Sequence, residues 1–355
     1  MNNNSSLPNL SKHRKDGLKA LCTLLPVAIA IILTNGVVLT LISRRKSLRT
    51  KSNYMLLSLA ICDFLTGAIN IPCFIVFSFE VVTSAMFNNF QYILHTLLSV
   101  SAAYHILVIT AEKYLAIVRP LRHYLVTKKN VFKILLGIWM TSTLIAVIPV
   151  VWNESSSRLL CYIIHSAICL SVVFFIPYAC MIYAFAVMFK MISKRVRPPL
   201  RSQRSRLQHK NITDRKCVLI FAIMAAIFAL CWFPYFAMML IININDYVKS
   251  DTSISIRKAT EAFAIIRYTV SITNPLLYTY FKRDFWLEIR NFLFKRRFSG
   301  SPAASRRKIL YFKKRPRSVD NNLRLSLSSD ARWSNMENDL FINSKEQVLL
   351  FITSV

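Results

Sequence analysis

Seven long apolar segments constrain the fold of this chain more than any other feature of its sequence. A helix that crosses a bilayer needs about 20 consecutive and mostly apolar residues, and 54% of the 355 residues are hydrophobic. The segments, separated by short connections, lie at roughly 18–42, 53–79, 87–111, 132–152, 160–191, 217–244 and 259–281. We therefore expect an all-α membrane protein built as a bundle of seven transmembrane helices.

The residues outside these segments divide into three further regions. Residues 1–17 are expected to form an extracellular N-terminal tail ahead of the bundle at 18–281. Residues 282–298 alternate aromatic and basic side chains, which predicts a short amphipathic eighth helix on the membrane surface. The remainder, 299–355, is rich in Ser, Arg and Asn, which is typical of a disordered cytoplasmic tail.

The net charge of +30 is distributed as a topology signal. Basic residues gather after the first, third and fifth segments, whereas the loops after the second and fourth hold almost none. Alternate loops that are basic follow the positive-inside rule, which places the N-terminus outside. The first tail and the loop at 243–258 also carry some basic residues. We expect the charge to set topology and attract membrane lipids, and we expect no nucleic-acid partner.

Short modification and recognition motifs agree with this topology. Asn3, Asn4, Asn9 and Asn153 head sequons on the side expected to be extracellular, which predicts glycosylation. At the other end, a hydroxyl at Thr353 precedes the apolar Val355 by two residues. This pattern suits strand addition to a PDZ domain, so a PDZ-domain protein is a candidate partner.

The segments carry a set of motifs in a fixed order. They are Asn35 with Val38, Leu59-Ala60 with Asp63, Glu112-Lys113-Tyr114, Trp139, Pro177, Cys231-Trp232-Phe233-Pro234 and Asn274-Pro275-Leu276-Leu277-Tyr278. In this respect the chain resembles the rhodopsin-like (class A) G protein-coupled receptors over about residues 20–295, with no match to one subfamily. The resemblance implies a multi-pass receptor of the cell membrane, not an enzyme, that binds an extracellular ligand and has a heterotrimeric G protein and arrestin as partners.

The resemblance also implies a switch that opens toward the G protein. Pro234 and Pro275 each remove a backbone hydrogen bond and kink their helices. Leu121 matches the apolar residue that members of this family insert into the G protein, and Tyr278 is the mobile tyrosine of the seventh segment. We expect activation to move the sixth helix outward.

Glu112-Lys113-Tyr114 departs from the family at its centre, where the family has Arg. The resemblance implies an ion pair between Lys113 and Asp214 at rest, but an ammonium lacks the donor fork of a guanidinium. Phe185 also stands where the family has a Tyr that meets Tyr278. A seven-helix decoy or arrestin-biased scaffold, with weak or no G protein activation, therefore stays open as an alternative.

Asp63 is an ionisable group near the middle of the membrane and needs polar partners or a cation. The resemblance implies a sodium pocket made by Asp63, Asn35, Ser271 and Asn274. Ala102 replaces the Ser that the family contributes from the third segment. The sequence leaves open whether a sodium ion or a proton neutralises Asp63, and it indicates no other cofactor.

The resemblance places the ligand pocket between the third, sixth and seventh segments. Its expected residues are Gln91, Tyr92, His95, Thr96, Ser99, Trp232, Tyr235, Phe236, Met239, Ala264, Arg267 and Tyr268. His95 replaces the Asp of amine receptors, and Tyr268 replaces the Lys that carries retinal, so neither ligand class is expected.

Arg267 is a cation in an apolar segment, where a charge requires a polar or charged partner. One reading is that it binds an anionic ligand with help from His95. The other is that it pairs with Glu261, Asp63 or backbone carbonyls. Lipid and peptide ligands are equally open.

Overall fold

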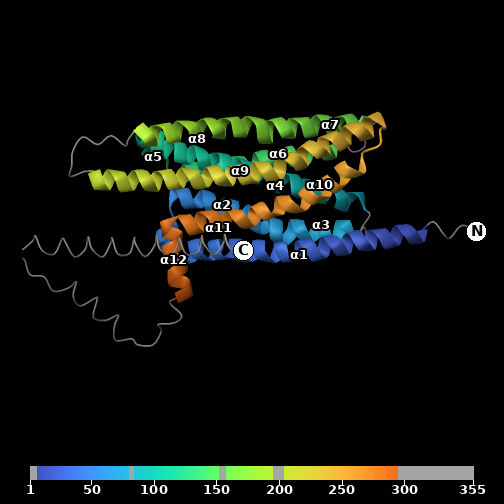
Figure 1. The fold of residues 1–355 in the computed structure, drawn as a ribbon, viewed down its shortest axis with the longest axis horizontal. Coiled ribbons are helices and arrows are strands. Elements are labelled where there is room, and N and C mark those ends of the chain that lie inside the picture. Colours follow the sequence, from blue (N-terminus) through green and yellow to red (C-terminus); the bar gives the residue numbers. More distant parts are fainter. Residues whose placement is uncertain (1–5, 80–83, 152–156, 195–203, 295–355) are drawn as a thin grey trace, which may run out of the picture. The chain divides into compact units, whose positions relative to one another are not determined.

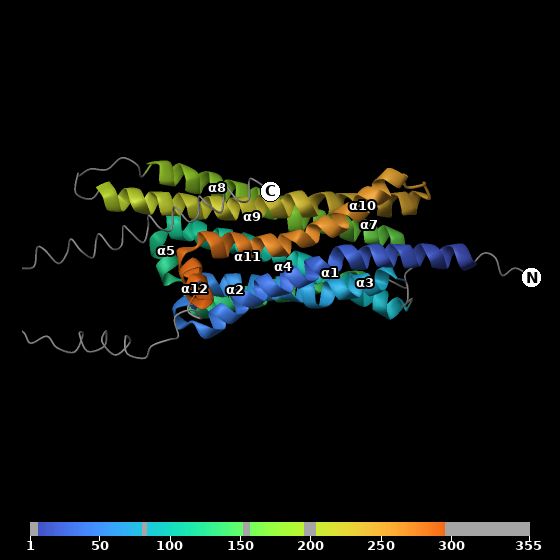
Figure 2. The same cartoon turned by 60° about the horizontal axis from the view of Figure 1, so that its bottom comes forward.

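The computed structural model describes residues 6–79, 84–151, 157–194 and 204–294 of the chain. The described residues are helical apart from short connections, and no strand occurs among them. Their helices run alongside one another in both views of the ribbon (Figures 1 and 2).

Each predicted segment is present as a helix or as a chain of helices. In order they are α1 (Ser6–Arg44); α2 (Lys51–Leu65), η2 (Thr66–Asn70) and α3 (Ile71–Ser78); α4 (Ala85–Val118); α6 (Lys128–Val151); α7 (Arg158–Cys169), η3 (Leu170–Phe175) and α8 (Ile176–Lys194); α9 (Arg204–Val248); and α10 (Ile254–Ile266), η4 (Arg267–Thr269) and α11 (Val270–Phe281). Within the described ranges, the first six are long and apolar enough to cross a membrane. The seventh segment is divided by the 3-10 turn η4, so neither half is that long by itself.

Prolines account for two of the irregular turns. The π-helical turns η2 and η3 end immediately before Ile71-Pro72 and Ile176-Pro177. A proline cannot donate to the preceding turn and its ring clashes there, and a wider π turn removes that conflict. Pro234 and Pro275 lie inside α9 and α11 without such a turn.

The helix α4 is at the centre of the packing. It contacts α2, α6, α8 and α9, and its buried residues belong to the largest hydrophobic cluster. Near the start of η2, the backbone comes very close to α1. A Cβ placed on Gly67 would lie 2.9 Å from Ile31 Cγ2, so only glycine allows this contact.

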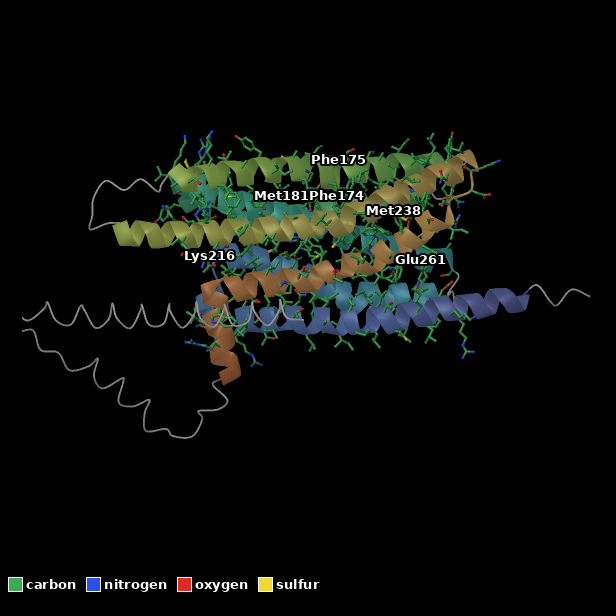
Figure 3. The ribbon with its side chains drawn as sticks, in the orientation of Figure 1. Phe174, Phe175, Met181, Lys216, Met238 and Glu261 are labelled. Atoms are coloured by element: carbon green, nitrogen blue, oxygen red, sulfur yellow. The ribbon has the colours of Figure 1, made fainter. Side chains whose placement is uncertain are left out.

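The outward face of the bundle is apolar, as expected of helices that face lipid. Leu33, Leu136 and Leu230 are between 62% and 73% exposed. Figure 3 shows the same division on the segment α7–α8, where Phe174 and Met181 are buried and the adjacent Phe175 is 56% exposed.

The two ends of the bundle hold different elements, and we call them the pocket end and the tail end. The pocket end holds the starts of α1, α4 and α7 and the end of α9, and the tail end holds the start of α9 together with α5 (Pro120–Leu125) and α12 (Arg283–Phe294). Lys216 lies toward the tail end and Glu261 toward the pocket end (Figure 3).

The first helix and the helix after the bundle were each predicted only in part. The helix α1 begins at Ser6, well before residue 18, so part of the expected N-terminal tail is helical. An eighth helix is present as α12, and its Phe285 is fully buried with its ring centre 5.9 Å from that of Tyr278. Its place on a membrane surface and the side on which the N-terminus lies stay predictions.

Candidate functional site

A cavity of about 520 Å³ opens at the pocket end between α4, α7 and α9. Seven of the twelve expected pocket residues line it. They are Gln91, Tyr92, His95, Thr96, Tyr235, Phe236 and Met239. The expected contribution of the third and sixth segments is therefore present in the geometry.

The other five expected residues do not line this cavity in the described part of the chain. They are Ser99, Trp232, Ala264, Arg267 and Tyr268. Trp232 is separated from the cavity by His95, whose ring stacks on the indole with the ring centres 5.6 Å apart. His95 thus belongs to the lining while Trp232 packs behind it.

Sequence reasoning missed the contribution of α7 to the cavity. The lining residues from this helix are Arg158, Leu159, Tyr162, His165, Ser166 and Cys169. Tyr162, His165 and Ser166 recur at helical spacing in an otherwise apolar segment, which is the signal that would have indicated an inward polar stripe. This stripe also contacts α4, because His165 Nδ1 lies 3.1 Å from the hydroxyl of Tyr92.

Arg267 is 1% exposed and is held by neutral groups. Its Nε donates to the Ala264 carbonyl (3.0 Å), its Nη1 lies 2.7 Å from His95 Nε2, and its Nη2 donates to the Tyr268 hydroxyl (3.2 Å). The guanidinium carbon also lies 4.0 Å from the centre of the Tyr235 ring, at cation–π distance.

The acids that were candidates for Arg267 have other partners. Glu261 lies 3.6 Å from Lys19, and Asp63 accepts from Ser271 and Asn274. Among the described residues no carboxylate lies within ion-pair distance of Arg267. Of the three pairings weighed from the sequence, the structure shows the one with a backbone carbonyl.

Asp63 lies deeper in the bundle with the three residues expected around it. Ser271 Oγ donates to Asp63 Oδ1 (2.7 Å) and Asn274 Nδ2 donates to Asp63 Oδ2 (3.2 Å). Asn35 Nδ2 donates to the Ser271 carbonyl (2.9 Å). The cluster is buried throughout.

The donor set of this cluster fits the sodium ion that the family resemblance implies. Asn35 Oδ1 and Asn274 Oδ1 are buried and have no hydrogen-bond partner in the described part of the chain. Together with the carboxylate of Asp63 they supply oxygen ligands, which hard cations prefer. A bound cation would compensate the buried carboxylate.

At the tail end, Lys113 is paired with its own neighbour. Its Nζ lies 2.7 Å from Glu112 Oε2 and donates to Ser52 Oγ (2.7 Å). Glu112 Oε1 in turn lies 2.9 Å from Nε2 of His123, which comes from α5. The expected pair between Lys113 and Asp214, which lies near the start of α9, stays a prediction.

Further switch residues take up defined places at the tail end. Leu121 on α5 is 83% exposed, as an apolar contact for a partner requires. Tyr278 is 1% exposed, and within the described residues its hydroxyl has no hydrogen-bond partner. Phe185 is buried on α8 and Tyr183 is 66% exposed. Tyr114 is partly buried at the end of α4.

All but one of the remaining predicted sites lie outside the described residues. Asn3, Asn4, Asn153, Thr353 and Val355 lie outside the described residues. Asn9 is in α1. Glycosylation and PDZ binding stay predictions.

The described helices thus form a bundle with a cavity at one end and a charged cluster at the other. Residues 34–278 match the family described as "7 transmembrane receptor (rhodopsin family)". The chain belongs to this family, and it is a G protein-coupled receptor and a multi-pass protein of the cell membrane. The family is one of receptors and not a class of enzymes.

The chain is similar to receptors for different ligand chemistries. It is 27% identical over 285 residues to the histamine H2 receptor of Canis lupus familiaris, which covers 74% of this chain and 76% of that protein. It is 24% identical over 308 residues to the octopamine receptor beta-1R of Drosophila melanogaster, with 73% of this chain and 58% of that protein covered. The RYamide receptor of Drosophila melanogaster is 24% identical over 289 residues, with 74% and 60% covered.

Proposed function

We propose that this chain binds an extracellular ligand in the cavity at the pocket end and activates a heterotrimeric G protein at the tail end. The observation that carries the proposal is the contact between His95 and Trp232. His95 lines the cavity, and Trp232 belongs to α9, two residues before the kink at Pro234. A ligand that moves His95 therefore acts on the helix that has to swing outward.

The tail end supplies the second half of the mechanism. Lys113 is held by Glu112 and Ser52, with its Nζ 5.4 Å from the centre of the Phe221 ring of α9. Outward movement of α9 would remove this ring and open a surface beside the exposed Leu121. The proposal places this end in the cytoplasm and the N-terminus outside.

The ligand is proposed to be neither a monoamine nor retinal. His95 takes the position of the acid that binds amines in this family, and Tyr268 that of the lysine that carries retinal. The names of the relatives include both amine and peptide receptors. Anionic, lipid and peptide ligands remain within the proposal.

The second candidate is a seven-helix decoy or an arrestin-biased scaffold with weak or no G protein activation. The observation that favours it is Lys113 itself, because its Nζ is already satisfied by the adjacent Glu112. A point-charge ammonium held in this way offers less to a G protein than the fork of an arginine.

A panel of G protein activation and arrestin recruitment assays separates the two candidates. Wild type and Lys113→Arg are compared across amine, peptide, lipid and carboxylate ligands. The proposal expects G protein activation by wild type, increased in Lys113→Arg. If neither protein activates any G protein while arrestin is still recruited, the scaffold is the correct reading.

A further inference from the structure

Two polar atoms without partners lie one helical turn apart on the face of α4 that lines the cavity. Gln91 and His95 both belong to the lining, and they are 6% and 9% exposed. In the described part of the chain neither Gln91 Oε1 nor His95 Nδ1 has a hydrogen-bond partner. Buried polar atoms are normally satisfied, whereas these two are unsatisfied hydrogen-bonding groups in residues that line the cavity.

Arg267 fixes the hydrogen-bonding sense of His95. A guanidinium carries only donors, and Arg267 Nη1 lies 2.7 Å from His95 Nε2. Nε2 must therefore accept with its lone pair, which places the ring proton on Nδ1. A second ring proton would bury two cations in contact. The free group of His95 is thus an N–H donor.

Gln91 is hydrogen-bonded to Asn70 on the neighbouring segment. The Nε2 of Gln91 donates to Asn70 Oδ1 (3.3 Å), so the amide oxygen of Gln91 is the atom left free. Two side chains of the cavity wall consequently carry one unsatisfied acceptor and one unsatisfied donor, from residues four apart on the same helix.

We propose that the ligand of this receptor carries a carboxamide that binds Gln91 and His95 together. Its carbonyl oxygen accepts from His95 Nδ1–H, and its N–H donates to Gln91 Oε1. Side chains at i and i+4 have Cβ atoms about 6 Å apart, and an amide with hydrogen bonds of about 2.9 Å at both ends spans such a gap. The proposal rests on the proposed function, in which this cavity is the ligand site.

Other polar groups satisfy only half of this pair. A carboxylate can accept from His95, but its second oxygen would then face the oxygen of Gln91. An ammonium can donate to Gln91 but has nothing to offer the N–H of His95. A free primary amide and the C-terminal amide of a peptide share the required chemistry.

The binding test uses purified full-length receptor in nanodiscs without G protein, so it does not depend on signalling. Three isosteric probes, 3-phenylpropanamide, 3-phenylpropanoate and 3-phenylpropylamine, are titrated by ligand-observed NMR, with propylbenzene as the apolar reference. The amide is expected to bind roughly fivefold or more tighter than each charged probe, as one lost hydrogen bond implies. Tighter binding of the carboxylate or the ammonium, or no preference over propylbenzene, overturns the proposal.

Matched variants assign the preference to the two residues. His95→Leu and Gln91→Met are each expected to weaken the amide roughly fivefold and to leave propylbenzene unchanged, which also verifies that the cavity is folded. His95→Asn keeps an N–H near the position of Nδ1 and is expected to restore most of the binding. Gln91→Glu is expected to shift the preference to the ammonium probe. Unchanged amide binding in His95→Leu contradicts the proposal.

Arg267 is a positioning residue in this account, and its role has a spectroscopic readout. In wild type, 15N spectra of labelled histidine should show His95 protonated at Nδ1 and bare at Nε2, assigned by the signal lost in His95→Asn. Arg267→Met should yield a mixture of tautomers and a weaker amide preference. A His95 signal that is already mixed in wild type would refute the donor assignment.

The two sources of an amide are separated by a second pair of probes. N-acetylphenylalaninamide represents the end of an amidated peptide, and N-acetylphenylalanine is its acid control. A peptide ligand predicts that the former binds tighter than 3-phenylpropanamide, and a small amide predicts the reverse. Failure of the G protein assays would leave these binding results standing, and the converse also holds.

Discussion

The two ends of the bundle each bury a cation, and they satisfy it in opposite ways. At the tail end, the side chain of Lys113 is 12% exposed and its Nζ is 2.7 Å from the carboxylate of the adjacent Glu112. At the pocket end, Arg267 is 1% exposed and is held by a carbonyl, an imidazole, a hydroxyl and aromatic rings. One cation is neutralised by a partner and the other is only solvated by neutral groups.

The tail end therefore holds a closed ion pair, whereas the pocket end holds an uncompensated charge that acts on a residue lining the cavity. Lys113 has its counter-charge in Glu112, so separating the two side chains costs free energy. We call this pair the lock. Arg267 retains its charge and transmits it through His95, whose remaining N–H becomes a stronger donor because linked hydrogen bonds polarise one another.

The largest effect is expected from removing the ammonium of Lys113. Lys113→Met leaves the carboxylate of Glu112, which is 9% exposed, without its nearest counter-charge. Breaking a buried pair in this way costs about 3 kcal/mol, so the thermal midpoint in detergent should fall by several degrees. Lys113→Arg keeps the charge and serves as control; equal midpoints for all three proteins would show that the pair is not a lock.

A smaller loss is expected from Arg267→Met, which strands only neutral groups. Unsatisfied neutral partners cost about 1–3 kcal/mol, partly offset because a buried charge is no longer desolvated. The same midpoint assay should rank Arg267→Met between wild type and Lys113→Met. The reverse order would mean that Arg267 has a counter-charge, and the contrast between the two ends would be lost.

Sodium should stabilise the cluster that lies between the two ends. Asn35 Oδ1 and Asn274 Oδ1 lack hydrogen-bond partners in the described residues, and an ion bound beside Asp63 at tenfold excess over its Kd would add about 1.4 kcal/mol. The midpoint in sodium chloride should exceed that in choline chloride for wild type but not for Asp63→Asn. A sodium effect of the same size in both proteins would assign it to another site.

The smallest effects are expected from single neutral hydrogen bonds at either end. Ser52→Ala removes a bond to Lys113, and Tyr268→Phe removes a bond to Arg267. Each should lower stability by about 1 kcal/mol, measured as nearly equal shifts in the midpoint. A much larger shift for Tyr268→Phe would contradict the equal weight given to these two bonds.

The sequence predicted most of the bundle because apolar runs of membrane length leave few alternatives. It did not predict the division of the seventh segment at Arg267–Thr269 or the start of α1 at Ser6. The turn at Arg267–Thr269 carries no proline or glycine, whereas α1 has Pro8 in its first turn, where a helix tolerates proline. The break at Arg267–Thr269 depends on contacts with neighbouring helices, such as that of Arg267 with His95, which a single sequence does not contain.

The candidate site was predictable where a residue's role depends on its own helix. Gln91, Tyr92 and His95 share one face of α4 and all line the cavity. The partners of Arg267 were not predictable, because His95 reaches it across 172 positions of sequence. Glu112 and Lys113 are neighbours in the sequence, but the family resemblance indicated the distant Asp214 as the partner of Lys113.

The central claim is that α9 moves when the receptor engages a G protein, and a distance measurement tests it directly. Spin labels would replace the exposed Lys129 on α6 and Lys216 on α9 as unnatural amino acids, since the chain has eight cysteines of its own. Pulsed electron resonance in nanodiscs would compare receptor alone with receptor bound to nucleotide-free G protein. The account predicts a shift to longer distances on G protein binding, larger in Lys113→Arg. An unchanged distribution in a complex that forms would contradict it.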